Sequence, residues 1–192
     1  MSSTENLLKK IRQCTHCQSQ LPLGPRPVIR ASETAKVIVV GQAPGTRVHR
    51  SGIPWDDASG KRLREWMGTE SSLFYDQSQI AIVPIGFCYP GKGRSGDLPP
   101  RPECAPMWHA AVLDTMPKIK LTLLVGQYAQ NYYLRDKLNL TQRVRGFCQY
   151  LPEYFVLPHP SPRNNLWLAK NPWFEEEVLP ILQARIAGLL TL

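Results

Sequence analysis

The stretch KVIVVGQAPG, residues 36–45, decides the fold. Its first half is an unbroken apolar run rich in β-branched residues, which is typical of a parallel strand buried on both faces of a sheet. Gly41 ends that run at once, and residues 41–45 form a tight loop flanked by two glycines. We therefore predict a buried strand at 36–40 that leads directly into a loop at one edge of a parallel sheet.

Three further apolar runs share this pattern, and each ends at a proline or a glycine. They lie at 80–83, 121–125 and 154–157. Helical patterns fall at 59–67, 104–116, 127–138 and 173–192, the last kinked or restarted at Pro180. Strands that alternate with helices predict the α/β class, here a three-layer α/β/α sandwich around a central, mainly parallel four-stranded sheet. The length of 192 residues suits a single domain over 1–192.

The charge balance favours a polyanionic partner. Lys and Arg number 23 against 15 Asp and Glu, which gives a net charge of +8. Each phosphate that a basic protein neutralises releases counterions, so nucleic acid is a candidate partner, although a merely basic protein has the same balance. The chain has no apolar run of about 18 residues to span a membrane and no signal-peptide core. We expect a cytoplasmic monomer.

Five cysteines suggest a metal centre rather than disulfides, because thiols stay reduced in the cytoplasm. Cys14 and Cys17 are separated by two residues, while Cys88 and Cys104 bracket a long loop at 89–102 that contains three Gly and four Pro. Four thiolates suit either a [4Fe–4S] cluster or tetrahedral zinc, and spacing alone does not separate the two. Four unrelated buried cysteines are the remaining alternative.

The fifth cysteine, Cys148, stands apart in the sequence. We interpret it as a small buried hydrophobe.

Two loops with unusual chemistry follow the first and last predicted strands. They are GQAPG at 41–45 and HPSPRN at 159–164. In open α/β sheets the ligand crevice lies beyond the carboxyl ends of the strands, so these distant loops should meet at the same edge. We place the active site there.

These two loops resemble the signature motifs of the uracil-DNA glycosylase superfamily. GIPW at 52–55, followed by ASG at 58–60, resembles the segment that supplies a base-stacking aromatic in the iron–sulfur branch, often called family four. The cysteine layout also matches that branch, and the resemblance covers about residues 10–190. It implies a DNA-repair glycosylase that flips out a deaminated base, uracil or a related one, and hydrolyses its N-glycosidic bond. It also favours the [4Fe–4S] cluster over zinc.

Cleavage of an N-glycosidic bond needs hydrogen-bond donors aimed at the negative charge that develops on the departing base. The backbone N–H groups of Gln42 and Ala43 can reach a base carbonyl, and Gly41 and Gly45 permit the close approach. His159 can donate to the developing oxyanion as a neutral imidazole. Taken singly, a glycine-rich turn or one histidine is more often structural.

The remaining candidates bind the substrate. The indole of Trp55 offers a face for stacking on the flipped base, although a large aromatic often belongs to the core. Ser161, Arg163 and Asn164 suit contacts with the phosphates of a kinked strand. Four residues are ambiguous between catalysis, DNA contact and simple solvation: His49, Arg50, Asp56 and Asp57.

Two positions depart from the family pattern. Ala43 stands where the best-known branch has the Asp that positions the attacking water; the iron–sulfur branch also lacks that Asp. Pro84, four residues before Cys88, stands where the iron–sulfur branch usually carries an Asn that reads the uracil edge, and a proline side chain cannot form those hydrogen bonds. We expect broader or altered base preference, and the alternatives are a hypoxanthine or xanthine glycosylase and a non-catalytic damaged-DNA-binding module of the same fold.

Overall fold

The computed structural model of the chain describes residues 2–94 and 96–190. Its main sheet has four parallel strands in the order β2-β1-β5-β6. They are β1 (Val37–Val40), β2 (Ile80–Ile82), β5 (Leu121–Val125) and β6 (Tyr154–Leu157). The predicted parallel four-stranded sheet is confirmed.

The strands are buried as their apolar runs predict. In the sheet register Val39 pairs with Ile82 on one side and with Leu123 on the other. Every residue of β1, β2 and β5 is buried. One hydrophobic cluster includes these strands and extends from Leu8 to Leu190.

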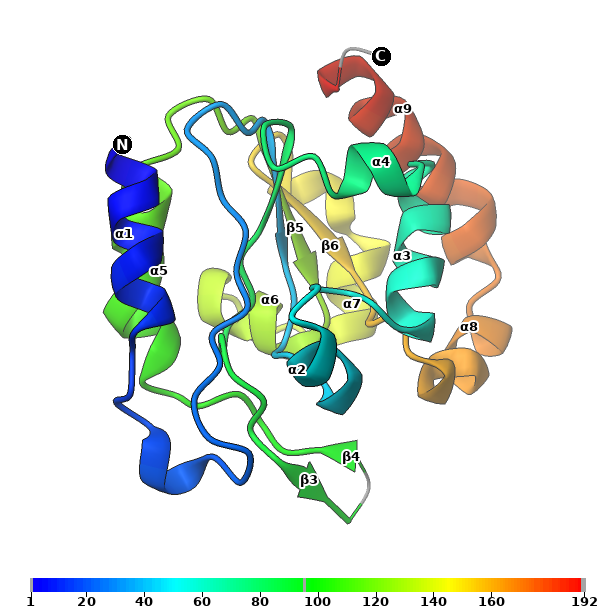
Figure 1. Cartoon of the computed structure of the whole chain (residues 1–192). Coiled ribbons are helices and arrows are strands. Elements are labelled where there is room, and N and C mark those ends of the chain that lie inside the picture. Colours follow the sequence, from blue (N-terminus) through cyan, green and yellow to red (C-terminus); the bar gives the residue numbers. More distant parts are fainter. Residues whose placement is uncertain (1, 95, 191–192) are drawn as a thin grey trace.

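Helices cover both sides of the sheet (Figure 1). On one side α1 (Ser3–Arg12) packs against α5 (Cys104–Asp114), and on the other α3 (Ala58–Met67) packs against α9 (Leu179–Leu189). This arrangement gives the three layers of the predicted α/β/α sandwich.

The predicted helix at 127–138 is wrong in its second half. α6 (Gln127–Tyr133) ends early, and α7 (Leu140–Arg145) follows. Between them the chain turns, because the buried guanidinium of Arg143 binds the Asp136 carboxylate at 2.8 Å and Tyr150 donates to the same carboxylate at 2.6 Å.

The C-terminal helical pattern is also divided. Phe174–Val178 (η4) forms a π-helix, and α9 starts directly after it with Pro180 in its first turn, where a proline removes no helical hydrogen bond. The predicted restart at Pro180 is therefore confirmed, while residues 191 and 192 lie outside the described residues.

Several short elements have no counterpart in the sequence prediction. The short helices are α2 (Thr46–Ser51), α4 (Ser71–Phe74), α8 (Asn165–Lys170), η1 (Gln18–Gln20), η2 (Phe147–Tyr150) and η3 (Pro162–Asn164). Within the long loop, β3 (Lys92–Gly93) and β4 (Gly96–Asp97) form an antiparallel hairpin.

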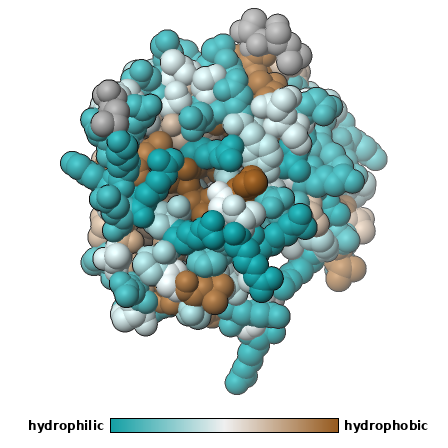
Figure 2. Space-filling view, viewed as in Figure 1, coloured by the Kyte–Doolittle hydropathy of each residue, from teal (hydrophilic) through white to brown (hydrophobic). Residues whose placement is uncertain are grey.

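The face of the molecule in Figure 2 is mostly hydrophilic, with hydrophobic residues gathered in a few small patches. None of the helices in the described part of the chain is both long and apolar enough to span a membrane.

Candidate active site

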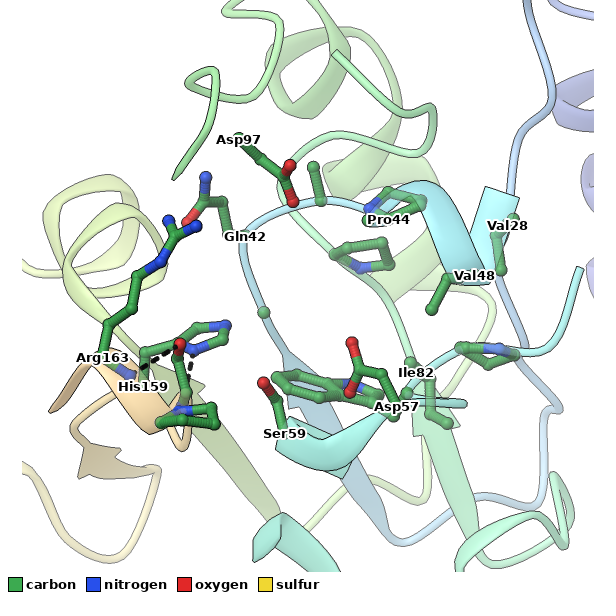
Figure 3. Close-up of a pocket in the computed structure, with 18 of the residues that line it drawn as sticks. Val28, Gln42, Pro44, Val48, Asp57, Ser59, Ile82, Asp97, His159 and Arg163 are labelled. Atoms are coloured by element: carbon green, nitrogen blue, oxygen red, sulfur yellow. Dashed lines mark hydrogen bonds between the residues drawn. The ribbon is translucent and has the colours of Figure 1, made fainter. Parts of the chain in front are cut away.

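A cavity of about 510 Å³, hereafter the main cavity, opens at the carboxyl edge of the sheet (Figure 3). Its walls come from the loop after β1, from residues 54–59, from the β3–β4 hairpin and from the loop after β6. All nine catalytic and substrate-binding residues predicted from the sequence line it: Gly41, Gln42, Ala43, Gly45, Trp55, His159, Ser161, Arg163 and Asn164. The expectation that the two motifs meet at this edge is confirmed.

The loop at 41–45 is fixed to its surroundings through its backbone. The carbonyls of Gly41 and Gln42 accept hydrogen bonds from Ile85 and Gly86, each at 2.9 Å. A Cβ at position 41 would lie only 2.7 Å from the indole of Trp55. Gly41 therefore makes room for the indole of Trp55. The sequence had suggested a base carbonyl as the neighbour of Gly41.

His159 is held in one orientation and one tautomer. The backbone N–H of Ser161 donates to Nδ1 at 3.2 Å, so the neutral ring carries its proton on Nε2. The side-chain amide of Asn164 donates to the His159 carbonyl at 2.7 Å. Burial lowers the pKa of His159 to about 4, and the nearby carboxylate of Asp57 opposes this shift. At neutral pH the imidazole is thus an uncharged donor.

Trp55 lies on the wall of the main cavity. Its φ of 57° falls in the left-handed region, which is unusual for a bulky residue. The carbonyl of Trp55 accepts from Tyr75 Oη at 3.3 Å and from Arg64 Nη1 at 3.4 Å, and these contacts hold the uncommon backbone conformation. The indole centroid lies 5.6 Å from that of His159, with the planes tilted by 32°. That it stacks on a base stays a prediction.

Two carboxylates line the cavity, one left ambiguous by the sequence and one missed. Asp57 caps α3, where Oδ1 accepts from Gly60 N at 2.8 Å. Asp97 comes from the hairpin; burial raises its pKa, while Arg163 and Lys92 act in the opposite direction. Its place in a Pro/Gly-rich loop gave no signal that could have identified it.

The four predicted metal ligands also come together, around a second and smaller cavity of about 30 Å³. It is lined by Cys14, Cys17, Cys88 and Cys104 and by mostly apolar neighbours, and is hereafter the cysteine cavity. Burial raises the pKa of Cys88 to about 11 and that of Cys104 to about 12. Binding to a metal must therefore displace protons.

The four thiols are not arranged around a single ion. Within residues 2–94 and 96–190, no three His, Cys, Asp or Glu side chains are grouped so that they could hold one metal ion. Cys148 is exposed, which corrects its interpretation as a buried hydrophobe. Its segment, η2, turns the thiol outward while Phe147 enters the core.

A buried histidine links the two cavities. On α5, His109 donates from Nε2 to the Pro84 carbonyl at 2.9 Å, and its Nδ1 lies 2.7 Å from Tyr133 Oη. Its ring stacks on Phe87, which precedes Cys88. His109 thus fixes the backbone that runs from the wall of the main cavity to the cysteine cavity.

This fold is shared by a known superfamily of enzymes. The chain belongs to the uracil DNA glycosylase superfamily, whose family model matches residues 29–183. It is similar to a type-4 uracil-DNA glycosylase of Sulfurisphaera tokodaii, with 25% identity over 150 residues, or 76% of this chain. The matched part spans 66% of the length of that relative.

We expect Gly60→Ala to destabilise the fold. A Cβ at position 60 would overlap the carbonyl oxygen of Trp55, and backbone cannot give way as a flexible side chain can. Urea unfolding should show a loss of about 1–3 kcal/mol. Gly188→Ala is the matched control, because it lies in α9 with open space around it and should stabilise by about 0.5–1 kcal/mol. Equal stability of Gly60→Ala and the unaltered protein would contradict this packing.

We expect His159 to titrate at about pH 4 in the folded protein. Because this pKa lies below the ordinary value of 6.5, the unfolded chain binds a proton that the folded chain does not. Stability should therefore decrease as pH falls below about 6.5, until about pH 4. NMR titration of the imidazole tests the midpoint, and His159→Gln should flatten this part of the stability–pH profile. A midpoint near 6.5 would contradict the lowering of the His159 pKa by burial.

Proposed function

We propose that the protein is a DNA-repair glycosylase that flips a deaminated base, uracil or a related one, into the main cavity and hydrolyses its N-glycosidic bond. The observation that carries this proposal is the convergence of a neutral His159, the loop at 41–45 and Trp55 on one cavity. Its volume of about 510 Å³ suits a small-molecule-sized group such as a base. Membership of the superfamily and the type-4 relative support the same activity.

In the proposed reaction the leaving base gains negative charge, which His159 stabilises. The imidazole is neutral at neutral pH because its pKa is far lower, and its Nε2–H donates to a base oxygen in that neutral form. The N–H groups of Gln42 and Ala43 supply further donors, and Trp55 provides the stacking face.

Asp57 is our candidate for the group that positions the attacking water, in place of the Asp that Ala43 replaces. One of its oxygens caps α3, which fixes the side chain. The carboxylate lines the cavity, close enough to His159 to act on the pKa of the imidazole. The second oxygen can accept a hydrogen bond from water. A carboxylate here also stabilises the positive charge that develops on the sugar.

The loop at 159–164 faces the DNA strand in this proposal. Ser161 and Arg163 line the mouth of the cavity and can contact phosphates, and the net charge of +8 favours such binding. Asn164 uses its amide to hold the His159 carbonyl, so its contribution includes the position of the imidazole.

We further propose that Cys14, Cys17, Cys88 and Cys104 hold a [4Fe–4S] cluster. Four thiols around one apolar cavity match the donor set, and the resemblance to the iron–sulfur branch favours the cluster over zinc. When bound, the cluster would act as a clamp between the N-terminal segment, the segment after β2 and the start of α5.

The whole chain as one domain, a monomeric state and a cytoplasmic location remain proposals. The single hydrophobic cluster from Leu8 to Leu190 supports the first.

We expect the protein to cleave an oligonucleotide that contains a deaminated base. A gel assay after alkali treatment, with uracil, hypoxanthine and xanthine in single- and double-stranded DNA, tests this. His159→Ala should lower the cleavage rate by about 10²–10³, the typical loss of one oxyanion donor, and leave DNA affinity nearly unchanged. Binding of damaged DNA without cleavage of any base would favour the alternative of a non-catalytic module.

We expect the purified protein to be brown and to absorb at about 400 nm, as thiolate-bound iron does. Cys88→Ser should remove the absorbance, whereas the exposed Cys148→Ser is the matched control and should keep it. A colourless protein with one zinc per chain would show that the four thiols hold zinc and not a cluster. A metal-free protein that is fully stable would refute a shared centre.

A further inference from the structure

Position 84, where the resembling branch carries a base-reading amide, offers no side-chain donor or acceptor to a base. Pro84 lines the cavity, but its side chain has no donor or acceptor. Its carbonyl already accepts the hydrogen bond from His109 Nε2 at 2.9 Å. Side-chain hydrogen bonds that select a base must therefore come from a residue other than Pro84.

The β3–β4 hairpin brings a carboxylate to the wall of the main cavity. Figure 3 shows Asp97 across the cavity from Asp57 and Ser59. Its Oδ2 lies 3.3 Å from the position that a Cβ on Gly45 would take, so the carboxylate sits against the loop at 41–45. The hairpin is tied to the same loop, because Gln42 Nε2 donates to the Leu98 carbonyl at 3.3 Å.

A guanidinium lies next to this carboxylate. The Arg163 side chain rests on Gly96, where any Cβ would overlap its Nη1, and both Arg163 and Asp97 line the cavity (Figure 3). Gly96, with a φ of 145°, leaves the room that the guanidinium occupies. The loop at 159–164 thus packs a cation against the hairpin that carries Asp97.

We propose that Asp97 reads the edge of the flipped base by accepting a hydrogen bond from a ring N–H. This inference rests on the proposed glycosylase function and names the residue that selects its substrate. The carboxylate takes the place of the acceptor oxygen that an amide would supply from position 84.

The chemistry of deamination explains what such an acceptor selects. Uracil, hypoxanthine and xanthine all present a ring N–H beside a carbonyl. Cytosine and adenine, held in the same orientation, present a ring nitrogen lone pair there, which a carboxylate would repel. Asp97 therefore accepts deaminated bases of different sizes and rejects their parents cytosine and adenine.

Opposing effects act on the charge of Asp97. Burial and the nearby carboxylate of Asp57 raise its pKa, whereas the cations of Arg163 and Lys92 act in the opposite direction. In its ionised form the carboxylate only accepts hydrogen bonds. Lys92 stands opposite Asp97 in the hairpin register.

The test is single-turnover cleavage of uracil and of 3-methyluracil, in which a methyl group replaces the ring N–H. Asp97→Ala should slow uracil cleavage about 10- to 100-fold, the effect of losing a hydrogen bond to a charged group. The ratio of the uracil cleavage rate to the 3-methyluracil cleavage rate should therefore decrease. Asp97→Asn, which keeps an acceptor oxygen and the side-chain shape, should lose less. Asp114→Asn is the matched control, because Asp114 is exposed at the end of α5, lines neither cavity and should retain the rate of the unaltered protein.

The affinity of each variant for abasic DNA, measured by fluorescence anisotropy, should equal that of the unaltered protein. Uracil cleavage by Asp97→Ala within twofold of the unaltered protein would overturn the inference while the glycosylase function stands. An equal loss on both substrates would also overturn it, because Asp97 would then only hold the hairpin. Failure of the unaltered protein to cleave any deaminated base would overturn the proposed function and this inference with it.

Discussion

Two backbone hydrogen bonds continue the pairing of β1 and β2 beyond the ends of the strands. Ile85 and Gly86 donate to the carbonyls of Gly41 and Gln42, each at 2.9 Å. They join the first motif to the segment that leads to Cys88, so that the main cavity and the cysteine cavity share one rigid stretch of backbone. His109 secures that stretch from behind through Pro84. This pairing therefore gives the loop at 41–45 and the segment that leads to Cys88 a shared anchor.

The second constraint is the conformation of Trp55. A left-handed φ in a tryptophan costs of order 1–3 kcal/mol and persists only where its surroundings enforce it. Here Tyr75 and Arg64 bind its carbonyl, and Gly60 leaves space for that carbonyl at the start of α3. The fold thus maintains a locally unfavourable backbone that turns the indole toward His159.

The sequence predicted the sheet and the meeting of the two motifs because both follow from strong regularities. Four unbroken apolar runs identify parallel strands, and the carboxyl ends of such strands share one edge. Other features follow from single tertiary contacts, which leave no periodic pattern. Arg143 and Asp136 end α6 early, His109 is one polar residue on an apolar helix, and Asp97 enters the cavity only because a glycine-rich loop folds into a hairpin. The roles of the site residues in catalysis remain predictions.

The bond between His109 and Pro84 has a consequence for how this cavity can change over time. The protein engages residue 84 through its carbonyl, a group that every amino acid carries. This hydrogen bond therefore does not depend on which side chain stands at position 84. Relatives that differ there could present different chemistry to the cavity while the same histidine kept the backbone of its wall in place.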